Sequence, residues 1–301
     1  MSIRISILLP LFVGLLGLFG LLSCKTPPAQ SSKPVVAVSV LPQAGLVEAL
    51  VSERAEVMVL VSPGQSPATY EPSPRQMSRL GAAWLYVRAG APFERGFVGK
   101  LAERHPTLKL LDMRDVVPLL TKTGQALAKG ADKDQADHHL WLDPQNLKLQ
   151  ARAIVAALAE KDPEGASFYQ TRLASLEKAI DVTDQRIAKR LAPFAGRRFM
   201  VHHPAYTYFA KRYKLVQVAV EHGGKHPHAK DMAELIEHAK HEGLRVIFVQ
   251  PQFSKSSAEL VAKAIGGKVV PLDPLAKDLL GNLESMAKKI ASAMKQTAEQ
   301  P

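Results

Sequence analysis

The sequence contains a single cysteine, Cys24, among 301 residues. One cysteine excludes a disulfide bond within the chain, so packed hydrophobic cores must stabilise the folded state. Hydrophobic residues make up 47% of the chain, which is enough to build such cores and excludes disorder over most of its length. The length allows two ordinary domains or one large domain.

Catalytic signatures are also missing from the sequence. It has no His-Glu-x-x-His pair, no nucleophile elbow and no glycine-rich loop for binding phosphate. These absences argue against an enzyme.

Acidic residues are the minority: 28 Asp and Glu stand against 39 Lys and Arg, and the formal net charge is +11. The basic residues are scattered, and no basic stripe interleaved with aromatic residues accompanies them. We therefore expect no nucleic-acid partner, and we interpret the charge as a solvated basic surface beside anionic lipid headgroups.

The longest apolar run lies near the N-terminus. It extends from Ile5 to Leu22 behind Arg4 and ends in Leu21-Leu22-Ser23-Cys24. A positive start followed by an apolar run and small residues is typical of a secretory signal. The four-residue ending resembles a bacterial lipobox, in which the cysteine is lipidated and becomes the first mature residue.

We therefore predict a signal peptide over residues 1–23 and a lipid on Cys24 that holds the mature protein to a membrane. The expected location is the cell envelope, facing the periplasm or the cell exterior. An uncleaved transmembrane anchor is the alternative, although the apolar run is near the lower length limit for spanning a bilayer.

After a flexible tether over residues 24–33, rich in proline and polar residues, strand-like and helix-like patterns alternate. We predict an N-terminal βα lobe over residues 34–161, with strands at 35–40, 57–61, 84–87 and 108–111 and helices at 43–51, 93–103 and 146–161. This alternation implies a mainly parallel sheet.

A long helix is predicted next, because Asp162-Pro163-Glu164 restarts a helical pattern that runs to about Leu191 without an internal proline. It lacks a sustained heptad repeat, so we interpret residues 162–192 as a rigid linking helix and not as a coiled coil. The alternation returns in a C-terminal βα lobe over residues 193–301, with strands at 198–201, 216–220, 245–249 and 268–270 and helices at 229–241, 256–265 and 283–296. The predicted class is α/β, with two lobes of mainly parallel sheet joined by one long helix.

Side chains of the metal-ligand type follow predicted strands or precede a helix in three segments. The segments are Asp137-His138-His139-Leu140-Trp141-Leu142-Asp143-Pro144, Val201-His202-His203-Pro204-Ala205-Tyr206 and Pro271-Leu272-Asp273-Pro274-Leu275. Open α/β sheets place their ligand sites at such positions. Two imidazoles and one carboxylate suit zinc, manganese or iron.

Five short motifs occur together over the chain: residues 66–74 (SPATYEPSP), 139–144 (HLWLDP), 203–206 (HPAY), 250–254 (QPQFS) and 272–275 (LDPL). In this order and spacing they resemble the metal-binding proteins of bacterial ABC importers for zinc and manganese, the ZnuA/TroA type. The resemblance implies a metal cleft between the lobes, with His139, His203 and Asp273 as ligands. It also implies Zn²⁺ as cargo with Mn²⁺ as the alternative, a permease of the importer as partner, and a monomer. His203 stands where manganese-type relatives often carry Glu, which favours zinc.

One position departs from the family pattern. The family's first ligand is a histidine in a Ser-Pro-His-x-Tyr segment, and this sequence has Ala68 there. Alanine cannot coordinate a metal, so water or another side chain must take its place. The candidates are Glu71, His138, His202 and the histidine-containing loop 221–228, which includes His222.

Three functions are compatible with these residues. The first is a lipid-anchored solute-binding protein that captures a divalent metal ion and delivers it to an ABC permease. The second is an adhesin or accessory protein that has lost tight metal capture, as Ala68 allows. The third is a zinc hydrolase with Glu71 as general base. For Asp143 two roles stay open: accepting a hydrogen bond from a ligating imidazole, or capping the helix that follows.

Overall fold

The structure, a computed structural model, describes residues 33–221, 229–253 and 256–298, and these described residues belong to one compact unit. The predicted signal peptide, Cys24, most of the tether and His222 lie outside the described residues. Within the described ranges, no helix combines the length and the apolar character needed to cross a membrane.

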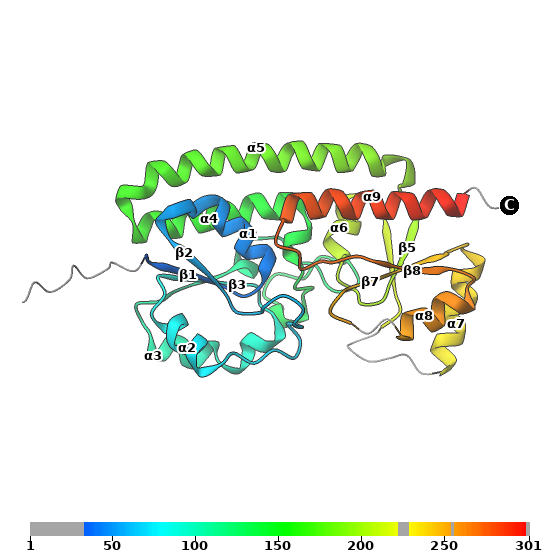
Figure 1. Cartoon of the computed structure of the whole chain (residues 1–301), viewed down its shortest axis with the longest axis horizontal. Coiled ribbons are helices and arrows are strands. Elements are labelled where there is room, and N and C mark those ends of the chain that lie inside the picture. The colour runs from blue at the N-terminus through cyan, green and yellow to red at the C-terminus, as the bar shows by residue number, and fades with distance from the viewer. Residues whose placement is uncertain (1–32, 222–228, 254–255, 299–301) are drawn as a thin grey trace, which may run out of the picture. The chain divides into compact units, whose positions relative to one another are not determined.

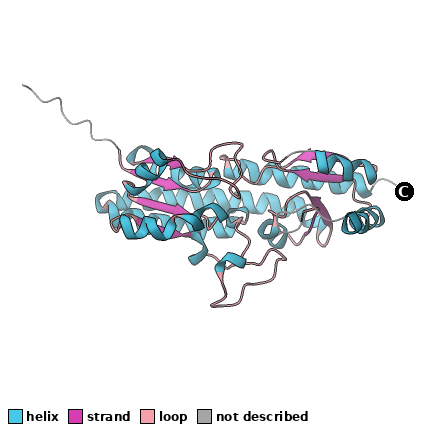
Figure 2. Ribbon diagram, turned by 90° about the horizontal axis from the view of Figure 1, so that it is seen from below, coloured by secondary structure: helices cyan, strands magenta, loops and turns pink. Residues whose placement is uncertain are grey.

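The strands in the described part of the chain form two four-stranded sheets, and neighbouring strands in each of them pair in parallel. The first sheet has the order β2-β1-β3-β4 and comprises β1 (Val35–Val38), β2 (Glu56–Val59), β3 (Leu85–Arg88) and β4 (Lys109–Asp112). The second has the order β6-β5-β7-β8 and comprises β5 (Arg198–Val201), β6 (Val216–Ala219), β7 (Val246–Val249) and β8 (Lys268–Pro271). Figure 2 shows the two groups of strands with helices alongside. The predicted parallel sheets are confirmed.

The inner strands are apolar because both of their faces are covered. All four residues of β7 are buried, as are three of the four in β1. Continuous runs of valine and isoleucine are typical of parallel strands that carry helices on both sides. The first half of the chain contributes α1 (Leu41–Val51), α2 (Pro74–Gly81), α3 (Val98–Arg104) and α4 (Pro144–Lys161). The second half contributes α6 (Thr207–Arg212), α7 (Ala229–His241), α8 (Ser256–Ala264) and α9 (Leu279–Ala298).

The predicted helix at 93–103 is divided in the structure. Residues Pro92–Gly96 form a 3₁₀ turn, and α3 begins only at Val98. The cause is Glu94, which is fully buried and accepts hydrogen bonds from the backbone N–H groups of Ala89 and Gly90 and from the Ser39 hydroxyl. These bonds hold the turn against the ends of β1 and β3.

The predicted linking helix is α5 (Ala166–Leu191), flanked by 3₁₀ turns at Pro163–Gly165 and Ala192–Phe194. It packs against α4 and α9 (Figure 1). The last helix, α9, begins four residues before its predicted start, and Lys277, just ahead of it, pairs with Glu48 of α1 at 2.8 Å. Thus α5 and the chain that leads into α9 both connect the two sheet-bearing halves. The boundaries at 34–161, 162–192 and 193–301 stay a prediction.

Candidate metal centre

Two histidines, one before α5 in the sequence and one after it, line the same cavity. His139 lies directly before the turn that leads into α4, and His203 follows β5. Their ring centroids are 5.7 Å apart. Both line a cavity of about 300 Å³, so the predicted pairing of these imidazoles is present in the structure.

The cavity lies at the carboxyl ends of strands from both sheets. Ala91 follows β3, Glu221 follows β6 and Gln250 follows β7, and all three line it. This is the edge at which parallel α/β sheets place ligand sites.

Each of the two imidazoles is held by a buried carboxylate. His139 Nδ1 lies 2.6 Å from Asp137 Oδ1, which also accepts the backbone N–H of His139 at 2.9 Å. His203 Nδ1 lies 3.2 Å from Glu221 Oε2. A proton on Nδ1 that is donated to a carboxylate leaves the lone pair on Nε2, which is the form of the ring that binds a metal.

The acidic partner of His139 is ionised at neutral pH. Burial raises the pKa of Asp137, but His139, through its charge when it is protonated and through its hydrogen bonds, together with a hydrogen bond from Thr207, outweighs burial and lowers the pKa. A buried negative charge beside the imidazole favours a cation in the cavity.

His138 is a neutral imidazole on the same cavity. Burial, followed by the neighbouring His139, lowers the pKa of His138 to about 4. Its Nδ1 is buried and has no hydrogen-bond partner among the described residues. Of the candidate substitutes for the missing family ligand, His138 lines the cavity, and its role as a ligand stays a prediction.

Ala68 lines the cavity, but its methyl side chain has no atom that can bind a metal ion. Ser66, Pro67 and Ala68 all line the cavity. Glu71 and His202 are not among the described residues that line it; Glu71 is exposed, and the buried His202 ring lies against Phe253.

The Asp273 carboxylate is hydrogen-bonded to neighbouring residues and does not line the cavity. Its Oδ1 accepts hydrogen bonds from Gln252 Nε2 at 3.1 Å and from the Leu275 N–H at 2.9 Å. It is not among the described residues that line the cavity, although Gln252 and Leu275 are. Across residues 33–221, 229–253 and 256–298, no three His, Cys, Asp or Glu side chains are grouped closely enough to hold one metal ion. The structure thus brings together His139 and His203 and leaves Asp273 apart from them.

Asp143 caps the helix that follows it, which is the second of the two roles predicted for it. Its Oδ1 accepts the Gln145 N–H at 2.8 Å, which makes Asp143 the N-cap of α4. Two other acidic residues, Asp137 and Glu221, contact the imidazoles instead. Sequence reasoning did not give them this role, because a carboxylate two residues from a histidine or on a neighbouring strand is a weak signal until the fold is known.

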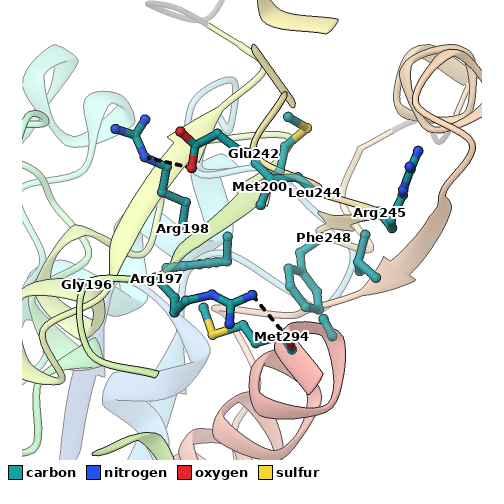
Figure 3. A pocket seen from close by; sticks show the side chains of 12 residues that line it. Gly196, Arg197, Arg198, Met200, Glu242, Leu244, Arg245, Phe248 and Met294 are labelled. Atoms are coloured by element: carbon teal, nitrogen blue, oxygen red, sulfur yellow. Dashed lines mark hydrogen bonds and ion pairs between the residues drawn. The ribbon is translucent and has the colours of Figure 1, made fainter. Parts of the chain in front are cut away.

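A second cavity, of about 110 Å³, lies at the amino ends of β5 and β7 (Figure 3). Arg197, Arg198 and Arg245 are among its lining residues. Arg198 pairs with Glu242 at 3.7 Å, and Arg197 donates to the Met294 carbonyl. Three guanidinium groups repel a metal ion, so this cavity is not the candidate centre.

Two parallel-sheet lobes, a long connecting helix and an imidazole-lined cavity at the strand ends define a two-lobed α/β binding protein. The model of the family ZnuA, the periplasmic component A of the zinc-uptake complex, matches residues 36–296. The chain belongs to this family, which confirms the resemblance inferred from the motifs.

Individual relatives agree with this assignment. A crystal structure of ZnuA superposes with a TM-score of 0.79 at 36% identity and covers 87% of this chain and 99% of that one. A Chlamydia trachomatis protein provisionally named as metal-binding is 27% identical over 90% of this chain and 95% of its own length. The high-affinity zinc uptake system protein ZnuA of Brucella abortus is 32% identical over 148 residues, which are 48% of this chain and 43% of the relative.

Proposed function

We propose that this protein captures a divalent transition metal ion, Zn²⁺ in the first place and Mn²⁺ as the alternative, and delivers it to the permease of an ABC importer. The observation that carries the proposal is the pairing of His139 and His203 across one cavity, each with Nδ1 on a buried carboxylate. Membership of the zinc-uptake family supports the same function.

The donor set suits zinc. Two neutral imidazoles are preferred zinc ligands, and the ionised Asp137 behind one of them offsets part of the cation's charge. Arg95 and Lys122 also line the cavity, but Arg95 is paired with Asp134 at 2.9 Å. A neutral His138 or water can complete the coordination where Ala68 supplies nothing.

Asp273 is proposed as the carboxylate ligand of the loaded form. Its Oδ1 is held by Gln252 and Leu275, so ligation requires the side chain to turn toward the cavity. Because His139 and His203 come from opposite halves of the chain, separating the halves would dismantle the site and release the ion to the permease.

The cellular arrangement is part of the proposal. Cys24 would carry the lipid, residues 24–33 would act as the tether, and the monomeric protein would work in the cell envelope.

Titration of metal-free, full-length protein in detergent with Zn²⁺ and Mn²⁺ tests the function. We expect tighter binding of zinc, and we expect His139→Ala and His203→Ala each to weaken zinc binding roughly 100-fold or more, since each removes an imidazole ligand. His238→Ala is the control, because His238 lies on α7 against Arg198.

Wild-type protein that fails to bind zinc at micromolar concentrations would contradict metal capture and favour the adhesin or accessory role. Ester or phosphate hydrolysis that disappears in His139→Ala would favour the hydrolase.

A further inference from the structure

Gln250 lines the metal cavity and carries a carboxamide oxygen without a hydrogen-bond partner among the described residues. It directly follows β7, is 3% exposed and lines the cavity. Its Oε1 is buried and accepts no hydrogen bond from any residue in the described part of the chain. A buried amide oxygen without a donor destabilises the fold, so its place in the wall of a ligand cavity needs an explanation.

The orientation of the carboxamide is fixed by Tyr206. The Tyr206 hydroxyl donates to the Leu272 carbonyl at 2.7 Å, because a carbonyl can only accept. A second hydrogen bond joins Tyr206 to the Gln250 side chain. Since the hydroxyl proton is already used, Gln250 Nε2 must be the donor in that bond, and Oε1 is the end of the amide that is left over.

The donors of neighbouring lining residues are used elsewhere. Trp141 Nε1 donates to the Pro274 carbonyl at 2.7 Å, and Gln252 Nε2 donates to Asp273. Neither of these donors is free for Gln250 Oε1, so we consider a donor that enters the cavity; because Oε1 is itself closed to solvent, the carboxamide must turn toward the cavity to reach it.

We propose that Gln250 is a further cargo-binding residue, whose Oε1 accepts a hydrogen bond from a water molecule bound to the captured metal ion. The inference rests on the proposed function. Ala68 removes one protein ligand from the family pattern and leaves a position that a water ligand can fill, and binding to a cation makes that water a strong donor. A neutral amide accepts this hydrogen bond without taking the proton, which suits reversible capture better than hydrolysis.

Zinc titration of Gln250→Leu, which removes the acceptor at similar volume, tests the proposal in the full-length protein in detergent. We expect binding about 10-fold weaker than in the wild type. Gln250→Glu keeps an acceptor and should bind zinc at least as tightly as the wild type. Gln150→Leu is the matched control, because Gln150 on α4 is fully buried, its amide has no hydrogen-bond partner among the described residues, and it does not line the cavity. It should leave zinc affinity unchanged, and thermal melts of the metal-free variants report folding separately.

Wild-type zinc affinity in a folded Gln250→Leu variant, alongside loss of binding in His139→Ala, would overturn this inference and leave the proposed function intact. Failure of the wild type itself to bind zinc would instead remove the proposed function. The visible spectrum of the Co²⁺-loaded protein supplies a second readout. An unchanged coordination number in Gln250→Leu supports contact through water, whereas loss of a ligand would mean direct coordination and overturn the proposal.

Discussion

The hydrogen bond between Asp137 and His139 decides which ring nitrogen can bind a cation. Asp137 is 2% exposed and accepts from both the ring and the backbone of His139. It therefore fixes the proton on Nδ1, orients the ring and supplies negative charge behind it. Carboxylates in this position commonly contribute 10–100-fold to metal affinity.

We predict that Asp137→Asn weakens zinc binding about 10-fold or more, measured by competition with a chelating dye. Asp143→Asn is the control, because asparagine also caps helices well and Asp143 contacts the start of α4. Equal losses in the two variants would mean that the effect is general and not carried by the contact with His139.

A second prediction at the residue scale concerns the wall of the cavity that lacks a ligand. Ala68→His restores an imidazole at a position that lines the cavity, so zinc should bind roughly 10-fold more tightly or better. Titration of this variant beside Ala68→Gln separates ligation from added bulk. Unchanged affinity in Ala68→His would show that another side chain, with His138 the foremost candidate, already occupies the coordination position.

The motifs imply His139 and His203 as ligands through the family resemblance, and the structure brings both side chains to one cavity, whereas their role as ligands stays a prediction. The roles of Glu221 and Gln250 could not be predicted in this way, since both depend on contacts between strands that only folding brings together. For Asp273, the motif predicts a ligand, whereas the structure shows its carboxylate held by Gln252 and Leu275.

At the scale of elements, α5 is tied to both halves through one buried side chain. Asp184 accepts hydrogen bonds from Gln145 at the start of α4, from Tyr213 after α6 and from Arg212 at the end of α6. Burial raises the pKa of Asp184, but these hydrogen bonds, led by Arg212, outweigh it and lower the pKa. The ionised carboxylate thus joins α5 to α4 and α6.

We predict that Asp184→Asn lowers the free energy of unfolding by about 2 kcal/mol at pH 7, measured by urea denaturation. A carboxyl group with a lowered pKa stabilises the fold above its unfolded-state pKa, about 3.9, and this contribution is lost as the pH falls through the folded-state pKa. The difference between wild type and variant should therefore shrink below about pH 4.

Asp181→Asn on the same helix is the control. Asp181 is 44% exposed in its side chain and pairs with Lys148, so its loss should change stability by no more than about 0.5 kcal/mol. A similar loss in both variants, or a pH-independent loss in Asp184→Asn, would contradict the account of this contact.

Most longer elements follow from the sequence within a few residues, because their apolar periodicity is sustained. The short helices α2 and α6 were not predicted, since six to eight residues give too little periodicity to separate from a loop. The division of the predicted 93–103 helix depends on the burial of Glu94, which the local pattern does not reveal.

At the scale of the whole described unit, several contacts besides α5 connect the two halves. Trp141 donates to the Pro274 carbonyl, the Leu120 N–H donates to the Tyr208 hydroxyl, and Lys277 pairs with Glu48. These connections restrain the halves, so metal capture should need only local movement around the cavity.

We predict no resolvable change in the radius of gyration between metal-free and zinc-loaded protein in X-ray scattering, because α5 and α9 pack along each other and bridge both halves. Zinc-dependent hydrogen-exchange protection should be confined to the segments around His139, His203 and Asp273. A large contraction on zinc binding would contradict the restrained arrangement.

The most direct test of the central claim is anomalous diffraction at the zinc edge from crystals of the zinc-loaded protein. We predict one strong peak about 2.0–2.1 Å from Nε2 of both His139 and His203, with Nδ1 of each ring still on Asp137 or Glu221. A zinc peak that contacts only one of these imidazoles, or lies elsewhere on the protein, would contradict capture between the two halves.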